Sequence, residues 1–357
     1  MKTWHILAPE YPPRCGGVGD YSALIGDGLL AAGDRVTVWH PGVLPDRFGA
    51  GSRRAIASAL RLDPGILLVQ YVPSAFGLRG MNVPFCRWLA HLSQTGADVR
   101  VMFHEPFFYF GLARPWRNVL AIGQRMMARS LLRGASRVYY STATWARLLA
   151  PHGAPPNVEV LPIPATIPVD VPAAAVDRAR ARRRSAFVAG HFGTYGDHVA
   201  GELRHVLPEV LRRLPDARAL LAGRGADAFA QTLEPAIRDR VDVLSATDAG
   251  EIAAMLRACD VLVQPYPDGV TTRRTSVMAA LSTGVPVITS DGPLTESVWR
   301  DSHAVALVPS GDYAGFGERA RALAADAGTR RELGCRGRRA YDEHFALGAT
   351  VARLRRP

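Results

Sequence analysis

Lysine is almost absent from this chain of 357 residues: Lys2 is the only one, so arginine carries nearly all of the positive charge behind the formal net charge of +11. The simplest interpretation of so much arginine is a compositional bias toward its codons. Attraction to phosphate or to an anionic surface is the functional alternative. Because the chain has no lysine other than Lys2, we expect any charged side chain that contacts a phosphate to be an arginine or a histidine.

Paired cysteines and long apolar runs are missing as well. The four cysteines lie far apart without a C-x-x-C pair, which gives neither a zinc-site spacing nor a disulfide framework, so we expect a protein of the reducing cytoplasm. No apolar run reaches the length of a bilayer span, and the first residues resemble a buried strand rather than a signal peptide. An apolar content of 48% over this length fits a soluble protein of two domains.

Short β-rich apolar runs alternate with longer helical patterns along the chain, which is typical of parallel sheets covered by helices on both faces. The expected strands are Thr3–Ala8, Val36–His40, Gly65–Gln70, Val99–His104, Arg137–Tyr140, Val158–Ile163, Ala186–Gly190, Ala217–Ala222, Val241–Leu244, Val261–Gln264, Val285–Thr289 and Ala304–Val308. The expected helices are Ser22–Ala32, Phe85–Thr95, Trp116–Arg133, Ala200–Arg213, Ala226–Ile237, Ala249–Ala258 and Thr275–Thr283.

A proline-rich stretch at 162–172 and an arginine run at 178–184 interrupt this alternation. We therefore predict an α/β protein of two doubly wound, Rossmann-like domains, residues 1–166 and 185–335, joined by a linker over 167–184. Ligands of such folds bind beyond the carboxyl ends of the strands, so the expected site is a cleft that both domains face.

The segment 268–289 predicts a loop, a short helix and a buried strand, with Arg273 and Arg274 where the helix begins. A helix N-terminus presents unpaired N–H groups and partial positive charge, which suit a phosphate, and an arginine fork can grip two phosphate oxygens. Together these features predict a seat for a diphosphate and indicate a nucleotide-linked substrate.

Glycine-rich turns follow three of the predicted strands. Gly16–Asp20 and Gly190–Gly196 each join a domain's first strand to a helix, the first of which is expected to begin near Tyr21; a tight turn is the plain structural interpretation of either. The dinucleotide pattern G-x-G-x-x-G fails at the first turn because Ser22 occupies the last glycine position. Gly223–Gly225 fits G-x-G-x-x-A, but it follows the second strand of its domain and is the runner-up dinucleotide site.

Polar residues end two neighbouring predicted strands of the first domain. His104 and Glu105 end one, and Gln70 and Tyr71 end the strand before it. At the carboxyl end of a parallel strand such residues point into the ligand zone, although a histidine there can equally be a satisfied core residue. The segment 114–133 interleaves arginines with apolar residues; it can lie on an anionic membrane or, as is more common, simply cover the sheet.

In this order, the landmarks resemble glycosyltransferase family 4, retaining enzymes of the GT-B fold. They run from Glu10-Tyr-Pro-Pro and the Gly16 turn, through Gln70-Tyr, His104-Glu and Phe192-Gly-Thr-Tyr-Gly, to Leu221-Ala-Gly-Arg-Gly, Ala280-Leu-Ser-Thr-Gly-Val-Pro-Val-Ile and Leu294-Thr-Glu-Ser-Val. The resemblance implies transfer of a sugar from a nucleotide diphosphate sugar to an acceptor, without a catalytic metal or other cofactor. It also implies that the nucleotide binds mainly to the second domain, the acceptor mainly to the first, and that a helix over 336–357 crosses back to the first domain.

The resemblance, with the turns and strand ends above, gives the candidate site residues. The catalytic candidates are His104, which would touch the donor sugar, Glu105 and Asp268. The donor-binding candidates are Gly16, Gly17, Gly193, Thr194, Tyr195, Arg224, Thr271, Thr272, Arg273, Arg274 and Thr275. The acceptor-side candidates are Tyr21, Gln70 and Tyr71.

Two departures from the family pattern stand out. The usual pair of glutamates, with seven residues between them, falls on Thr271 and Ala279, neither of which is acidic; Asp268 is the candidate to replace the first in part. The arginine and lysine that often follow the first strand of the second domain are also missing. We hypothesise that Arg273 and Arg274 supply this charge to the diphosphate instead.

Other functions remain open on the sequence alone. The missing glutamates suggest a catalytically weakened nucleotide-sugar-binding protein, and a sugar-nucleotide epimerase can share the same architecture. Nucleic-acid binding is the weakest alternative because no motif for it is present. For a transferase, the acceptor can be a glycan, a lipid-linked intermediate or a small metabolite. We expect a cytoplasmic protein, held at the inner face of the membrane if segment 114–133 binds anionic lipid.

Overall fold

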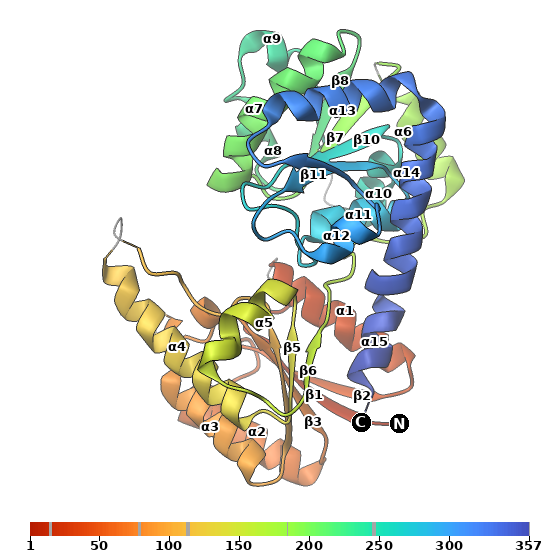
Figure 1. The fold of residues 1–357 in the computed structure, drawn as a ribbon. Helices are drawn as coiled ribbons and strands as arrows, with labels where there is room; N and C mark the ends of the chain where they lie inside the picture. Colours follow the sequence, from red (N-terminus) through yellow and green to blue (C-terminus); the bar gives the residue numbers. More distant parts are fainter. Residues whose placement is uncertain (14–15, 78–79, 112–114, 184, 245–247, 357) are drawn as a thin grey trace. The chain divides into compact units, whose positions relative to one another are not determined.

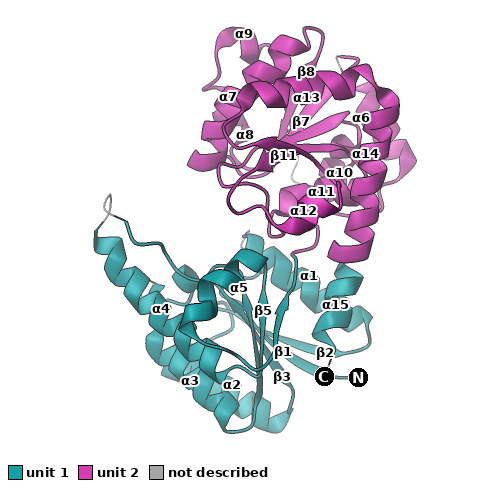
Figure 2. Cartoon of the chain, in the orientation of Figure 1, with its two compact units in different colours: residues 1–162, 347–357 teal, residues 163–346 magenta. Residues whose placement is uncertain are grey.

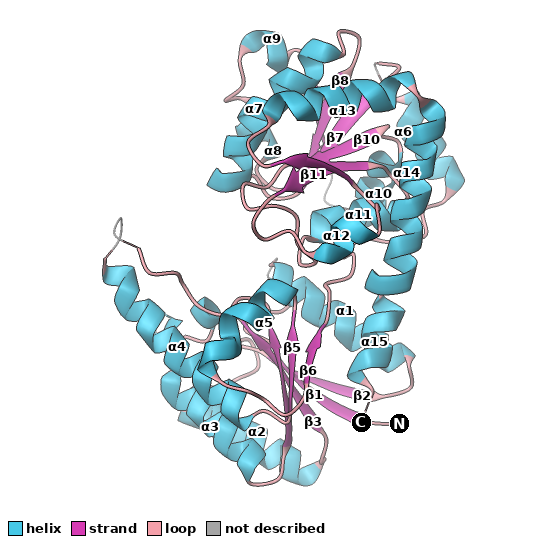
Figure 3. Ribbon diagram, in the orientation of Figure 1, coloured by secondary structure: helices cyan, strands magenta, loops and turns pink. Residues whose placement is uncertain are grey.

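The structure, a computed structural model, describes residues 1–13, 16–77, 80–111, 115–183, 185–244 and 248–356. The chain divides into two compact units, which Figure 2 colours separately. Unit 1 comprises Met1–Pro162 together with Leu347–Pro357, and unit 2 comprises Ile163–Ala346. Each unit contains a six-stranded sheet with helices packed around it (Figures 1 and 3), which confirms the predicted α/β architecture of two Rossmann-like domains.

The sheet of unit 1 has the strand order β2-β1-β3-β4-β5-β6, and its described strand pairings are parallel. Its strands are β1 (Thr3–Leu7), β2 (Arg35–Trp39), β3 (Ile66–Tyr71), β4 (Asp98–Phe103), β5 (Arg137–Tyr140) and β6 (Val158–Val160). Its helices are α1 (Gly17–Ala31), α2 (Ala50–Leu62), α3 (Val83–Gln94), α4 (Trp116–Gly134), α5 (Ala143–Leu149) and α15 (Leu347–Leu354). The central strand β3 is buried along its whole length, as its run of four apolar residues, Ile66–Val69, predicts for a strand covered on both faces.

The sheet of unit 2 has the order β12-β11-β10-β7-β8-β9, again with parallel pairings. Its strands are β7 (Val188–Phe192), β8 (Arg218–Ala222), β9 (Val241–Leu244), β10 (Val261–Gln264), β11 (Val287–Asp291) and β12 (Ala306–Pro309). Its helices are α6 (Ala173–Ala181), α7 (Asp197–Arg213), α8 (Ala226–Ala230), α9 (Pro235–Arg238), α10 (Ala249–Arg257), α11 (Thr275–Thr283), α12 (Ser297–Asp301), α13 (Tyr313–Ala325) and α14 (Ala327–Ala340). A π-helical turn, Tyr341–Phe345, extends α14.

The predicted strands are all present, with ends displaced by a few residues, and helix α11 has the predicted bounds. The helices differ more from the prediction. Helix α1 begins at Gly17 rather than near Tyr21, and α2, α5 and α12 were not predicted. The helix expected over 226–237 is divided into α8 and α9, because Pro235 lacks the N–H that a continuous helix needs and is instead the first residue of α9.

The division into units differs from the predicted domain boundaries. The expected linker over 167–184 belongs wholly to unit 2: Val171, Val176 and Ala179, the last two on α6, are buried in its core. The chain re-enters unit 1 at Leu347, later than the predicted 336, and α15 packs there against α1. Arg100 holds this C-terminal segment, since its Nη1 donates to the carbonyl oxygens of Leu354 and Arg356 at 2.9 and 3.0 Å. Within the described ranges, no helix is both long and apolar enough to cross a membrane.

Candidate functional site

Two loops meet at the carboxyl end of the unit 2 sheet, one after β7 and one after β8. The backbone N–H of Gly193 donates to the Ala222 carbonyl at 3.1 Å, and that of Tyr195 donates to Arg224 at 3.4 Å. Gly223 has a φ of +111°, and a Cβ there would collide with the Gly193 carbonyl oxygen, so only glycine lets the loops approach this closely. The structure thus brings together two of the predicted donor-binding turns.

Side chains of these two loops divide into packed and exposed groups. The Tyr195 ring stacks on Phe229 with centroids 5.2 Å apart, and its hydroxyl donates to the Ala222 carbonyl at 3.5 Å. Thr194 and Arg224 are exposed. The packed tyrosine fixes the turn, and the exposed hydroxyl and guanidinium are the groups that a ligand at this sheet end can reach.

A buried histidine, absent from the predicted site, lies beneath these loops. His191 is the second-last residue of β7, and its Nδ1 donates to the Val263 carbonyl at 2.8 Å. Burial lowers its pKa to about 4, although the hydrogen bond to the carbonyl acts in the opposite direction, so the ring is neutral near pH 7. Its position near the end of a central strand is a sequence signal that could have identified it.

Arg274 lies at the N-terminus of α11 and is held in place by a tyrosine. Its guanidinium carbon is 4.1 Å from the ring centroid of Tyr266, and the Tyr266 hydroxyl hydrogen-bonds the Ser276 hydroxyl at 2.7 Å. Helix α11 has no side-chain cap at this end, and both Arg273 and Arg274 are half-buried. The helix start thus combines backbone N–H groups with two guanidinium groups, as the predicted diphosphate seat requires.

Glu296 shapes the loop that carries these arginines. Its carboxylate accepts the backbone N–H of Thr272 at 2.5 Å and the Thr272 hydroxyl at 3.0 Å, and the side chain is buried. The neighbouring Thr271 is also buried, and no described residue hydrogen-bonds its hydroxyl. The sequence analysis missed this contact because the two segments lie 24 positions apart.

The positions of the missing glutamate pair have different surroundings. Ala279 is fully buried within the core of unit 2 on α11. Asp268, the candidate to replace the first glutamate, is exposed on the turn that follows β10, and Thr275 is the half-buried first residue of α11. A catalytic role for Asp268 stays a prediction, since the structure gives its carboxylate no hydrogen bond to the loop that bears Arg273.

In unit 1, the ends of β3 and β4 bring His104 and Gln70 together. The His104 Nε2 lies 2.8 Å from the Gln70 Oε1, and because an amide oxygen only accepts, Nε2 carries the proton. The Tyr21 ring meets the imidazole edge-on at 4.9 Å, and the Trp145 Nε1 donates to the His104 carbonyl at 2.8 Å. The Gln70 Nε2 is buried without a hydrogen-bond partner in the described ranges, so an oxygen of a ligand could satisfy it.

The other predicted residues of this group are placed differently. Tyr71 packs in the apolar core against Phe76 and Phe103, with ring centroids 5.8 and 4.8 Å apart, whereas Glu105 is exposed. Burial raises the pKa of Tyr71 and of Tyr21 well above the ordinary value, so neither phenol ionises near neutral pH. The packing of Tyr71 gives it a structural role, and an acceptor role for it stays a prediction.

The first glycine turn contains a carboxylate that the sequence analysis did not place. Glu10 Oε1 accepts the Gly19 N–H at 3.3 Å, and a Cβ on Gly16 would collide with the Glu10 carboxyl group. Gly16 is the extended residue before α1, and Gly17 has open space beside it. A phosphate placed at this helix start would therefore share it with a negative charge from the chain itself.

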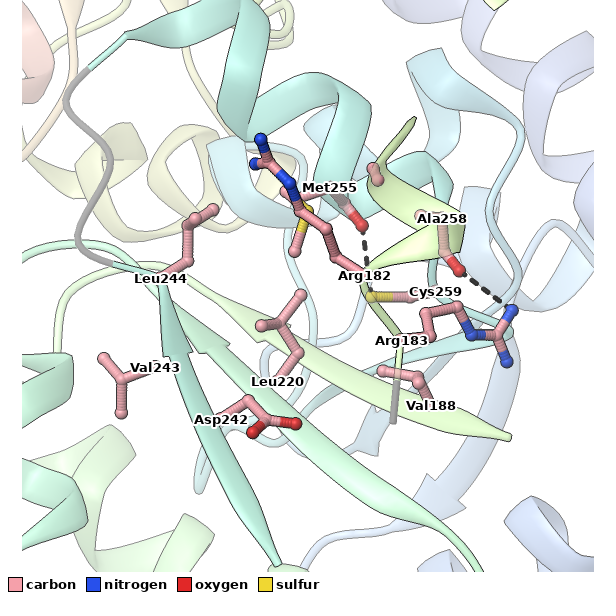
Figure 4. A pocket seen from close by; sticks show the side chains of 11 residues that line it. Arg182, Arg183, Val188, Leu220, Asp242, Val243, Leu244, Met255, Ala258 and Cys259 are labelled. Carbon is pink, nitrogen blue, oxygen red and sulfur yellow. Dashed lines mark hydrogen bonds between the residues drawn. The ribbon is translucent and has the colours of Figure 1, made fainter. Parts of the chain in front are cut away.

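A small cavity of about 190 Å³ lies on the face of the unit 2 sheet covered by α6 and α10 (Figure 4). Apolar side chains such as Val188, Leu220 and Met255 line much of it, and Arg183 donates to the Ala258 carbonyl at 3.3 Å beside it. Burial raises the pKa of the Cys259 thiol there to about 12. The cavity is smaller than the ~300–1,000 Å³ typical of small-molecule sites, so it is not the expected donor site.

Residues 184–326, which include the loops after β7 and β8 and the start of α11, match the family described as Glycosyl transferases group 1. A phosphatidyl-myo-inositol mannosyltransferase of Mycobacterium leprae is 30% identical over 121 residues, which are 34% of this chain and 32% of that protein. The matched stretch is therefore about a third of the length of that curated relative.

Solved structures resemble the whole chain. A sucrose-phosphate synthase from Thermosynechococcus elongatus superposes with a TM-score of 0.75 at 15% identity, covering 99% of this chain and 97% of that one. Anabaena HepE in complex with UDP and glucose gives 0.72 at 12% identity, with 99% and 98% covered. WaaG, a glycosyltransferase involved in lipopolysaccharide biosynthesis, gives 0.66 at 15% identity, with 98% of each chain covered. These likenesses establish the GT-B fold, and with the family match they confirm the resemblance to a group 1 type glycosyltransferase.

Proposed function

We propose that the chain is a retaining glycosyltransferase that moves a hexose from a nucleotide diphosphate sugar to a hydroxyl acceptor. The observation that carries the proposal is the start of α11, where uncapped N–H groups and the half-buried Arg273 and Arg274 lie within the family-matched segment. Relatives of known structure support the donor class, since HepE was solved with UDP-glucose.

The chemistry follows from the charge that develops on the leaving group. As the glycosidic bond breaks, the diphosphate gains negative charge, and preorganised N–H groups and guanidinium groups stabilise it. Tyr266 holds the Arg274 guanidinium before any ligand binds, so little ordering remains to be done on binding. A diphosphate oxygen then takes the proton of the acceptor hydroxyl, which requires no pair of carboxylates.

A panel of nucleotide sugars tests this function. Uridine and guanosine diphosphate sugars are screened for a rise in melting temperature and then for transfer to candidate acceptors, with the anomeric configuration of the product read by proton NMR. We expect one nucleotide diphosphate to stabilise the protein and its sugar to be transferred with retention. An inverted product would contradict the mechanism, and stabilisation by none of the nucleotides would contradict the function.

A catalytically weakened protein that binds nucleotide sugars is the second candidate function, and the alanine at position 279 favours it. A buried alanine stands where the family carries an acidic residue, and Asp268 is exposed rather than packed beside Thr271. A protein that only binds nucleotide sugars would show the melting shift without transfer or hydrolysis. An epimerase would convert the nucleotide sugar without any acceptor.

The charge of unit 1 supports an anionic or membrane-bound acceptor. Unit 1 holds 20 of the 43 lysines and arginines but only nine of the 32 acidic residues, so it carries the whole formal charge of +11, whereas unit 2 is neutral overall. An anionic surface attracts such a unit over about a Debye length. We include in the proposal that unit 1 docks on an anionic lipid bilayer, where a lipid-linked acceptor would lie.

Helix α4 provides the docking face. Its exposed large apolar side chains, Trp116, Val119, Ile122 and Met126, recur at intervals of three and four, which places them on one side of the helix. Exposed Arg129 continues this stripe. Tyr109 and Phe110 in the preceding loop are exposed as well. An apolar stripe continued by arginine fits an interfacial helix better than one that only covers a sheet.

Arg125 joins the aromatic loop to this helix. Its guanidinium lies 4.0 Å from the ring centroids of both Phe107 and Phe110, and its Nη1 donates to the Phe108 carbonyl at 3.0 Å. The loop is therefore fixed to α4 before any membrane is met, and both can be buried together.

Vesicle flotation tests the docking. Serine at Trp116 and Ile122 removes about 2–4 kcal/mol of apolar burial, so partitioning onto vesicles rich in phosphatidylglycerol should fall about 30-fold or more. Serine at Val43 and Leu62, which are also exposed apolar residues of unit 1 but lie off this face, is the matched control and should change little. Equal partitioning of all the variants would exclude the α4 face.

A further inference from the structure

Unit 2 contains a second, larger hollow that the proposed function does not use. It is a groove of about 810 Å³ lined by the residues that precede β10 and β11, namely Cys259–Asp260 and Thr283–Pro286, and by α6, α10 and α14. The groove lies at the C-terminal end of α11, whereas Arg273 and Arg274 lie at its N-terminal end. The amino ends of the strands thus form this groove, and the carboxyl ends form the candidate donor site.

Arginine dominates the lining of this groove. Six arginines contribute to it, against three carboxylates: Arg180, Arg257, Arg330, Arg331, Arg338 and Arg339 face Asp260, Asp342 and Glu343. The resulting local charge of +3 contrasts with the overall neutrality of unit 2. A concentration of one charge inside a hollow focuses the field and attracts anions.

Two of these arginines make hydrogen bonds and ion pairs within unit 2. Arg330 donates to the Leu323 carbonyl at 2.7 Å and lies 3.8 Å from Asp260. Arg338 pairs with Asp342 at 2.8 Å and donates to the Ser282 carbonyl at 2.9 Å. These contacts hold α14 against the end of α11 and neutralise two of the three carboxylates.

The other four arginines of the groove make no such contacts with the described part of the chain. Arg180, Arg257, Arg331 and Arg339 are exposed, and the structure gives them no hydrogen bond or ion pair with any residue that it describes. They come from three different helices, α6, α10 and α14, so their convergence on one hollow is a property of the fold rather than of one basic segment.

We propose that this groove binds a ligand that carries several phosphate groups. Arginine forks match phosphate oxygens in pairs, and the volume lies within the range of small-molecule sites. The stems of Arg331 and Arg339 are eight residues apart on α14, about 12 Å along the helix, so the basic surface is longer than a single phosphate needs. Clustered phosphates occur both in soluble polyphosphates and in the headgroups of phosphoinositides, and the chemistry of recognition is the same for both.

Cys335 provides a reporter within the groove. Its thiol is exposed there, whereas Cys86 and Cys259 are buried. In a Cys15→Ser background, the rate of alkylation by iodoacetamide, a neutral reagent, is measured against the concentration of tripolyphosphate or inorganic phosphate. We expect tripolyphosphate to slow alkylation at least fivefold at saturation, and to act at concentrations at least tenfold lower than phosphate.

Two double variants separate the groove from general charge effects. Alanine at Arg331 and Arg339 should weaken tripolyphosphate binding, measured by calorimetry, at least tenfold. Alanine at Arg178 and Arg319, which are exposed arginines of unit 2 outside the groove, removes the same charge and should leave binding within twofold. An equal loss of tripolyphosphate affinity in both double variants would overturn the proposal. A loss of that affinity only in an Arg273→Ala, Arg274→Ala variant would overturn it as well.

Vesicles distinguish the two sources of clustered phosphate. Protection of Cys335 by vesicles that contain phosphatidylinositol bisphosphate, but not by tripolyphosphate, would assign the groove to a lipid headgroup. Protection by tripolyphosphate but not by these vesicles would assign it to a soluble ligand. Protection by neither would refute the site. Nucleotide binding at the start of α11 should be unchanged by alanine at Arg331 and Arg339, so failure of the groove and failure of the proposed function are read separately.

Discussion

Replacing Tyr266 with leucine tests how the Arg274 guanidinium is held. The tyrosine is buried, its ring centroid lies 4.1 Å from the guanidinium carbon, and its hydroxyl bonds Ser276. Leucine keeps an apolar side chain there but removes the π face. A cation–π contact contributes about 0.5–2 kcal/mol, so the dissociation constant of the bound nucleotide diphosphate should rise about 2- to 30-fold.

Phenylalanine at the same position separates the ring from the hydroxyl. It preserves the contact with Arg274 and removes the hydrogen bonds of the hydroxyl, to Ser276 at 2.7 Å and to Gln264 at 3.5 Å. The net contribution of one such hydrogen bond to folding stability is about 0.5–1.5 kcal/mol. We therefore expect nucleotide affinity close to that of the unaltered protein and a modest loss in denaturant unfolding.

A double-mutant cycle decides whether the tyrosine acts through the arginine. Affinity for the nucleotide is measured by calorimetry in the unaltered protein, Tyr266→Leu, Arg274→Ala and the double variant, and unfolding by urea confirms that each is folded. If Tyr266 positions Arg274, the leucine substitution should have almost no effect once Arg274 is alanine. Fully additive losses would refute the positioning role, since each residue would then contribute independently.

Two further predictions concern buried polar groups of unit 2. Glu296→Ala leaves the buried Thr272 N–H without its acceptor, which should cost about 1–3 kcal/mol in urea unfolding, whereas Glu296→Gln should cost less because one oxygen remains; equal costs would contradict the role given to the carboxylate. The pKa of His191 is about 4 in the folded state, below its ordinary value of 6.5, so its contribution to stability is complete above pH 6.5 and is lost as the pH falls toward 4. The stability difference between the unaltered protein and His191→Gln should therefore shift by about 3 kcal/mol between pH 7 and pH 4, and a difference independent of pH would show that the ring is not buried in its neutral form.

The fold could be predicted from the sequence because its strands are short, mostly apolar segments that alternate with helical patterns. The bounds of β5, β9 and β10 agree with the prediction because β-branched, aromatic or leucine side chains fill most of their positions, even though the edge strand β9 contains Asp242. Helix α2 was missed because Gly51 and Ser52 lower the helix propensity of its first turn; in the structure its apolar face is defined by packing of Ile56.

The site was predicted less completely, for reasons of geometry. Gln70 and Tyr71 were grouped as one acceptor surface, but successive strand residues point to opposite faces, and only Gln70 meets His104. The contacts of Glu10 with the Gly16 turn and of Glu296 with Thr272 join separate segments of chain, and nothing in local periodicity reveals them. Arg273 and Arg274 were identifiable because a helix start and its charge are adjacent in the sequence.

The central claim is that a diphosphate binds at the start of α11, and the affinity of a double arginine variant tests it most directly. In the Arg273→Ala, Arg274→Ala protein, loss of two charged hydrogen-bonding groups at about 1.5–3 kcal/mol each predicts a rise of at least 100-fold in the dissociation constant of the nucleotide diphosphate. The Arg178→Ala, Arg319→Ala protein, with the same loss of charge elsewhere on unit 2, should bind as the unaltered protein does. Unchanged affinity in the first variant, with its fold intact, would contradict the account.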